Sequence, residues 1–67
     1  MHMVPVRFSS AIAAVGYDPQ TRRMKITFTQ GHTYDFCGVP RHVHAGVMRA
    51  PSKGAYYNEH IKDRYPC

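Results

Sequence analysis

The amino-acid sequence predicts an α+β fold: a three-stranded antiparallel β-meander covered by two C-terminal helices, in the order β-β-β-α-α. Apolar and polar residues alternate over residues 22–37, and apolar residues recur at helical spacing after Pro40. The 67 residues suffice for one domain with a small core. We expect a single domain over residues 1–67, ordered over about residues 6–65, with residues 1–5 as a loose arm.

The first strand is expected over residues 7–17, which are rich in small and apolar side chains. Ile12 and Val15 can share one face of this strand only across a β-bulge. A helix over residues 11–15 is the alternative, but it would be too short to be stable alone. The Asp-Pro-Gln-Thr sequence at residues 18–21 predicts a type I turn, because Asp accepts a backbone hydrogen bond and Pro presets φ.

A β-hairpin is expected over residues 22–37, and two loop lengths are possible for it. In its first strand, polar residues alternate with three apolar ones: Met24, Ile26 and Phe28. A two-residue loop would place Tyr34 and Phe36 beside a lysine, on the face away from that apolar series. The two rings would then be free to stack on a ligand.

A three-residue loop instead pairs Ile26 with Tyr34, Met24 with Phe36 and Lys25 with Asp35. This register gathers the large apolar side chains on one face and sets opposite charges across from each other. It also puts Gly31 last in the loop, where a G1 bulge needs a left-handed residue. We therefore expect the three-residue loop, with both aromatic rings in the core or at its rim.

Two helices are expected after the hairpin. Pro40 suits the start of the first, Pro51 ends it, and its apolar stripe is Val39, Val43, Val47 and Ala50. Ser52 suits the N-cap of the second, whose stripe is Tyr57, Ile61 and Tyr65. Gly54 weakens the first turn by about 1 kcal/mol relative to Ala, so a start near Ala55 is the alternative.

The charge balance favours an anionic partner. The chain contains nine Lys and Arg residues but only four Asp and Glu residues, which gives a formal net charge of +5. The cations are scattered along the chain, and a charge of this size also occurs for solubility alone.

The two cysteines are too few for the disulfide scaffold of a small secreted domain. We expect Cys37 and Cys67 to be free thiols in a reducing compartment, with Cys67 frayed at the chain end. The N-terminus lacks the apolar segment of a signal peptide, and no apolar run is long enough for a membrane span. A cytoplasmic location is therefore expected, without membrane association.

Several short motifs in this chain resemble those of the KTSC domain. They are Ser9-Ser10, Ile12, Val15-Gly16-Tyr17-Asp18, Ile26-x-Phe28, Gly31, Tyr34-x-Phe36, Val39-Pro40, Ala50-x-Ser52-x-Gly54, Tyr56-Tyr57-Asn58 and Ile61-Lys62. The family's Tyr-x-Tyr is Tyr34-Asp35-Phe36 here, so the second hydroxyl is absent. The resemblance implies a domain that occurs at the C-terminus of some bacterial lysyl-tRNA synthetases and as a free-standing bacterial or phage protein. Attachment to a synthetase implies RNA binding.

We expect a non-catalytic module that binds RNA or another polyanion through a basic face, without a cofactor. The candidate residues are Arg22, Arg23, Lys25, His32, Tyr34, Phe36, Arg41, Lys53 and Lys62. Among them, Lys53 lies at a helix start, where backbone N–H groups can help to hold a phosphate. The alternative is a protein-interaction module that docks on a host or synthetase-type partner through exposed tyrosines. We expect a monomer, or a weak homodimer through an exposed sheet edge.

Metal binding and catalysis are not expected. Cys37, His42 and His44 are close in sequence, but two histidines two residues apart on a helix point in different directions. Cys37 with His32 or His42 suggests a thiol nucleophile, yet nothing in the sequence orients a histidine base beside it.

Overall fold

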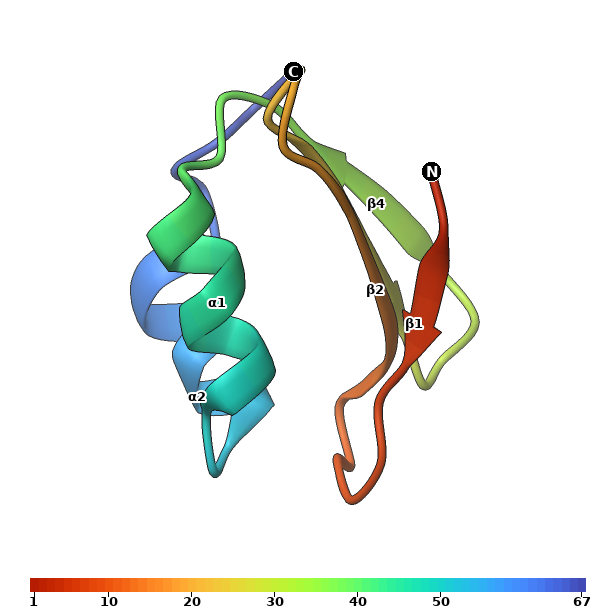
Figure 1. Cartoon of the computed structure of the whole chain (residues 1–67). Helices are drawn as coiled ribbons and strands as arrows, with labels where there is room; N and C mark the ends of the chain where they lie inside the picture. The colour runs from red at the N-terminus through yellow and green to blue at the C-terminus, as the bar shows by residue number, and fades with distance from the viewer.

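The computed structural model describes all 67 residues and shows an α+β fold, in which a helical layer lies against one face of a curved antiparallel sheet (Figure 1). The sheet has four strands in the order β1-β2-β3-β4. The elements are β1 (Met3–Pro5), β2 (Ile12–Asp18), β3 (Arg23–Phe28), β4 (Thr33–Phe36), α1 (Arg41–Arg49), α2 (Lys53–Tyr56) and η1 (Tyr57–Ile61). None of the helices has the length and apolar character needed to cross a bilayer.

The prediction of three strands is wrong, because the sheet has an additional N-terminal strand, β1. The residues of β1 were expected in a loose arm, but they pair with β2. Met3 lies opposite Gly16, and Pro5 lies opposite Ala14. Gly16 makes room for this pairing, since an added Cβ would lie 2.6 Å from the Met3 sulfur. Pro5 has no N–H group, so it fits only on a sheet edge such as this one.

The second correction concerns the start of the expected first strand. Residues 7–11 form the turn between β1 and β2, and β2 begins at Ile12. The Ser9 hydroxyl oxygen accepts hydrogen bonds from the N–H groups of Ala11 (3.3 Å) and Ile12 (3.0 Å). This local bonding of serine to the following backbone competes with strand pairing.

The bulge expected in β2 is confirmed. Ile12 pairs with Phe28, but Ala14 pairs with Thr27, so one extra residue lies between them on β2. The bulge allows both Ile12 and Val15 to face the helical layer, where each is at most 1% exposed.

The three-residue hairpin loop is confirmed as well. Ile26 lies opposite Tyr34, and Gly31 closes the loop with φ of 100°. The Phe28 N–H donates to the His32 carbonyl (2.8 Å), and the Gly31 N–H donates to the Phe28 carbonyl (2.9 Å). The turn at residue 18 also forms, but it is one residue longer than expected, since the Arg22 N–H donates to the Asp18 carbonyl at 2.8 Å.

The core lies between the sheet and the helical layer. Its buried members are Ile12, Val15, Met24, Ile26, Phe36, Val39, Val43, Val47 and Ile61. In α1, Pro40 takes the N-cap position, one residue before the helix. The Ser52 side chain caps α2 as expected, α2 begins at Lys53, and the helix continues as a π-helical turn that ends at Ile61. Tyr65 packs on the core from beyond that end.

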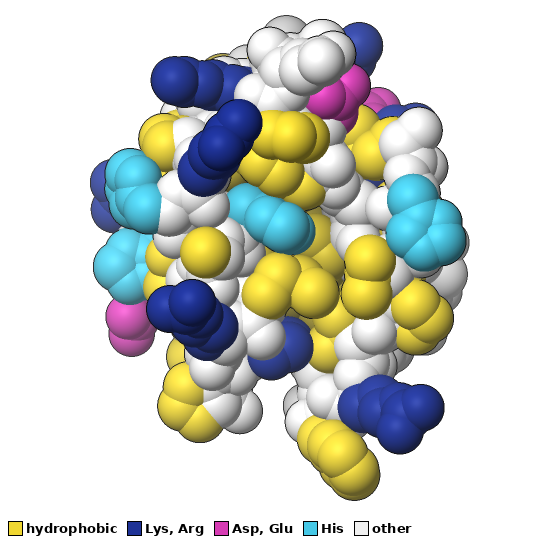
Figure 2. All heavy atoms as spheres, viewed as in Figure 1, with side chains coloured by type: hydrophobic (Ala, Val, Ile, Leu, Met, Phe, Trp, Pro, Cys, Tyr) yellow, Lys and Arg dark blue, Asp and Glu magenta, His cyan; other side chains and the backbone are white.

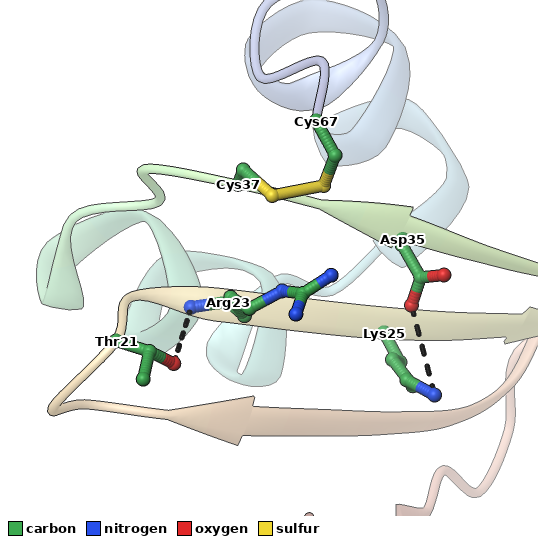
Figure 3. Close-up of a disulfide and its surroundings, with 6 residues drawn as sticks. All are labelled: Thr21, Arg23, Lys25, Asp35, Cys37 and Cys67. Atoms are coloured by element: carbon green, nitrogen blue, oxygen red, sulfur yellow. Dashed lines mark hydrogen bonds and ion pairs between the residues drawn. A yellow bond between two sulfur atoms is a disulfide. The ribbon is translucent and has the colours of Figure 1, made fainter.

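A disulfide between Cys37 and Cys67 contradicts the expected free thiols (Figure 3). Their Cα atoms are 4.8 Å apart, although 30 positions separate them in sequence. The chain end is not frayed, because the Cys37 N–H donates to the Tyr65 carbonyl (3.0 Å) and so holds the C-terminal tail along β4. The cysteine count could not reveal this, because the approach depends on how the tail returns to the sheet.

Candidate functional site

The structure distributes the candidate residues over several surfaces, so they do not form one basic face. Arg22, Arg23 and Arg41 lie at the end of the molecule that carries the C-terminus. Lys25 lies on the sheet face away from the helices, His32 lies in the β3–β4 loop, and Phe36 lies in the core. Tyr34 and Lys62 line a cleft beside β4, and Lys53 lies at the end of α1.

The first of these surfaces brings arginines from two parts of the chain together. The Val39 N–H donates to the Arg22 carbonyl (2.8 Å), so the segment leading into α1 rests on the β2–β3 turn. Arg22 from that turn, Arg23 from the start of β3 and Arg41 from the first turn of α1 are all exposed. Figure 2 shows Lys and Arg side chains around this end of the molecule.

A fourth arginine, which the sequence did not single out, lies near the same helix turn. Arg64 and His42 line one surface hollow, and His42 is the second residue of α1. The first turn of α1 contains no acidic side chain, and Glu59 is the one carboxylate among the residues that line the hollow. We call Arg22, Arg23, Arg41 and Arg64 the basic end.

Lys25 is less available to a ligand than the basic end. Its ammonium group lies 3.7 Å from the Asp35 carboxylate across the β3–β4 pair, as the hairpin register predicted (Figure 3). Both side chains are about half exposed. The pair is therefore a surface ion pair of small energy, and its net charge is zero.

The second surface is an open cleft of about 420 Å³ beside β4, which we call the β4 cleft. Its lining residues are Tyr34, Asp35, Phe36, Tyr57, Lys62, Asp63, Tyr65 and Pro66. The β4 strand forms one wall and the C-terminal tail forms the other. The disulfide to Cys67 holds that second wall in place.

Tyr34 and Phe36 share the face that packs on the helices, but they differ in burial. Phe36 is 8% exposed and contacts the Tyr57 ring edge-on, so it belongs to the core and has no face free to stack on a base. Tyr34 is 53% exposed, because the helical layer does not reach this edge of the sheet. Its ring packs edge-on against Phe28 with centroids 5.7 Å apart, and the His32 ring lies beside it at a centroid distance of 6.3 Å.

Tyr57 forms part of the wall of the β4 cleft and keeps its proton. Burial raises the pKa of its hydroxyl, and the negative charge of Asp63 and the neighbouring Tyr34 raise it further. The Tyr57 hydroxyl is therefore a hydrogen-bond donor at neutral pH.

Lys53 does not form the phosphate site expected at the start of the second helix. Its ammonium group donates to the carbonyl oxygens of Met48 and Ala50, both at 3.0 Å. These carbonyl groups lie at the C-terminal end of α1, where they lack helical hydrogen-bond donors. Lys53 supplies donors to them while it also begins α2. Charge counting could not show this, because it depends on the angle between the two helices.

The histidines and cysteines lie apart. His44 stacks on Tyr17 with ring centroids 4.5 Å apart, and burial lowers the pKa of its imidazole. His42 is exposed on α1, and the sulfur of Cys37 is bonded to Cys67. No group of three or more side chains is arranged to hold a metal ion.

Comparisons with known proteins agree on one family. A family model described as KTSC domain matches residues 8–65. A protein of Tsukamurella paurometabola is 41% identical over 63 residues, which cover 94% of this chain and 92% of that relative. A lysine–tRNA ligase of Nostoc sp. is 36% identical over 56 residues, which cover 84% of this chain and 10% of the ligase. The crystal structure of a KTSC domain protein from Yersinia pestis superposes with a TM-score of 0.92 at 39% identity, covering 98% of this chain and 92% of that one.

Proposed function

The chain belongs to the KTSC domain family, and from this premise we propose that it is a non-catalytic module that binds RNA or another polyanion through its basic end. The observation that carries the proposal is the hydrogen bond from Val39 to Arg22, which brings the β2–β3 turn against the start of α1. Arginines from both segments thereby meet at one end of the molecule. The lysine–tRNA ligase relatives, whose substrate is an RNA, support the choice of ligand.

Arginine suits this role because its planar guanidinium group binds phosphate oxygens with paired hydrogen bonds. All four side chains of the basic end are exposed. Asp18 lies in the β2–β3 turn beside Arg22, and one of its carboxylate oxygens accepts a hydrogen bond from the Gln20 N–H at 2.9 Å. Four phosphate contacts to a single strand predict that log K falls with log salt with a slope of roughly 3.

The test is a salt titration of binding to a fluorescent 12-nucleotide single-stranded RNA, followed by anisotropy. In the variant Arg22→Gln/Arg41→Gln we expect at least tenfold weaker binding and a slope lower by about 1.4. The matched control is Arg7→Gln/Arg49→Gln, which removes the same charge from the β1–β2 turn and from the other end of α1. The control should weaken binding by less than about threefold, through net charge alone. Equal losses in the two variants, or no binding of the parent protein at low salt, would contradict the proposal.

We also propose a cytoplasmic location, where an RNA ligand would be met. That compartment reduces most disulfides, so the titration is run with and without a thiol reductant. Arg22, Arg23 and Arg41 lie outside the C-terminal tail, so opening the Cys37–Cys67 bond should affect only the contribution of Arg64 and lower the salt slope by at most about 0.7.

A further inference from the structure

The outer edge of β4 has backbone groups that the fold leaves free. The Phe28 N–H bonds to the His32 carbonyl, so in the antiparallel alternation Tyr34 and Phe36 point their N–H and C=O groups toward β3. Thr33 and Asp35 point theirs outward. Cys37 is next in this outward series, and its N–H does bond outside the sheet, to the Tyr65 carbonyl at 3.0 Å.

The opposite edge of the sheet is better protected. β1 has three residues, and one of them is Pro5, which cannot donate to another strand. At the β4 edge, the C-terminal tail covers Cys37 and reaches no further. No hydrogen bond within the chain uses the outward N–H groups of Thr33 and Asp35. The bond from Cys37 to the tail shows that the β4 edge can pair with an extended segment. The tail leaves the edge positions at Thr33 and Asp35 unpaired.

The β4 cleft lies directly beside these free groups. A strand added to β4 would alternate its side chains, and those on the helix side would point into the cleft beside Tyr34. Tyr34, Tyr57, Tyr65 and Pro66 give this space an apolar and aromatic lining. Tyr34 is also one of four large apolar or aromatic side chains that remain more than one third exposed.

We propose that the β4 edge and the β4 cleft together bind an extended acidic peptide segment of another protein. The segment adds a fifth strand opposite Thr33 and Asp35 and places one aromatic or large aliphatic side chain against Tyr34. Within the cleft Lys62 offsets Asp63, and Lys25 pairs with Asp35, so the acidic character of the segment follows from the net charge of +5 on the whole chain. The same charge disfavours a second copy of this chain as the added strand. The site does not include Arg22, Arg23 or Arg41.

The probe is a displayed library of random dodecapeptides, selected on the oxidised protein. We expect selected peptides to share an aromatic or large aliphatic residue flanked by Asp or Glu. With the best peptide, amide chemical-shift changes should centre on residues 33–35 and 62–66, and hydrogen exchange at Thr33 and Asp35 should slow at least tenfold. Backbone N-methylation at alternate positions of the peptide should abolish binding, because it removes the donors that pair with β4.

Two variants at one position separate the backbone from the side chain. Asp35→Pro removes an outward N–H without breaking a bond to β3, and edge strands tolerate proline at such positions. It should weaken peptide binding at least tenfold. Asp35→Ala loses the same ion pair with Lys25 but keeps the N–H, and it should bind within threefold of the parent. If Asp35→Pro does not fold, the N-methylated peptides provide the same test.

Other outcomes would overturn the proposal. They are no enrichment of peptides, shifts centred on α1 or on Arg22 and Arg23, equal binding by the proline and alanine variants, or a dimer through β4 in sedimentation. Because Arg22 and Arg41 do not line the β4 cleft, Arg22→Gln/Arg41→Gln should retain peptide binding. A failure of the RNA proposal and a failure of this one are therefore distinguishable.

Discussion

The phenol ring of Tyr56 lies against the backbone of α1 at Gly46, in the space that a side chain at position 46 would occupy. A Cβ built on Gly46 would overlap the Tyr56 hydroxyl, and the ring atom Cε2 would lie 2.8 Å away. The same ring also contacts His60 at a centroid distance of 4.4 Å. The two parts of the helical layer are thus joined by a contact that only glycine permits.

Gly46→Ala should therefore destabilise the protein, although alanine is the better helix former. The propensity gain is about 1 kcal/mol, whereas displacing a packed ring costs about 1–3 kcal/mol. We expect a net loss of about 1 kcal/mol in the free energy of unfolding, measured by urea denaturation. In a Tyr56→Ala background the same substitution should stabilise by about 0.5–1 kcal/mol. A loss of equal size in both backgrounds would show that the ring is not the cause.

Lys53 and Arg41 should give opposite results when each is replaced. Lys53→Met keeps the apolar stem but loses two charged hydrogen bonds to the end of α1, so it should lower the free energy of unfolding by about 1–2 kcal/mol. Its effect on the salt dependence of RNA binding should be small. Arg41→Gln should leave stability nearly unchanged and lower the salt slope by about 0.7. Thermal unfolding and anisotropy titrations of both variants check this, and Lys62→Met is the control for loss of an exposed lysine.

Stability should fall as the solution is acidified through the titration of His44. Its folded-state pKa is lowered from the usual 6.5 because burial against Tyr17 disfavours the charged form. The unfolded chain therefore takes up this proton more readily than the folded one. The stabilisation is complete above pH 6.5 and is lost as the pH falls through the folded-state pKa.

The variant His44→Phe keeps an aromatic stack on Tyr17 but cannot be protonated. Urea denaturation at pH 7.5 and at pH 5 should show a smaller loss of stability for this variant than for the parent. His32→Gln, at an exposed loop position, is the matched control for the loss of one histidine. An unchanged loss in His44→Phe would assign the pH dependence to other groups.

Removing the disulfide should cost about 3–4 kcal/mol in the free energy of unfolding, from the entropy of closing a loop of 30 residues. Urea denaturation of Cys67→Ser, compared with the parent in the presence and absence of reductant, measures this. The variant should be insensitive to reductant and should match the reduced parent. If reductant did not change the free energy of unfolding of the parent protein, the expected contribution of the disulfide would be wrong.

The hairpin register could be predicted because several independent constraints agreed. Met24, Ile26 and Phe36 need one buried face, and a loop that ends on Gly31 supplies the positive φ of the bulge. The strand β1 could not be predicted in the same way. Three residues show no periodicity, and the pairing of Met3 depends on the open space at Gly16, a residue that is distant in sequence.

The candidate sites were predictable in residue type but not in placement. The sequence identifies Arg22 and Arg41 as cations, yet only the bond from Val39 to Arg22 places them at one end. It gives no reason to separate Lys53, which is used within the fold, from Lys62, which lines a cleft. Arg64 was missed because it follows the last helical turn and belongs to no pattern.

The bond between Cys37 and Cys67 has a topological consequence for the helical layer. Both helices lie between these two cysteines, so residues 37–67 form a covalent macrocycle whose only covalent link to the rest of the chain is at Cys37. A protease that nicks the exposed turn around Pro51 would leave its two products linked. The protein would keep the mass of the whole chain plus one water until a thiol separates the two pieces. Each helix would then have a new free end, while the far end of each would remain anchored.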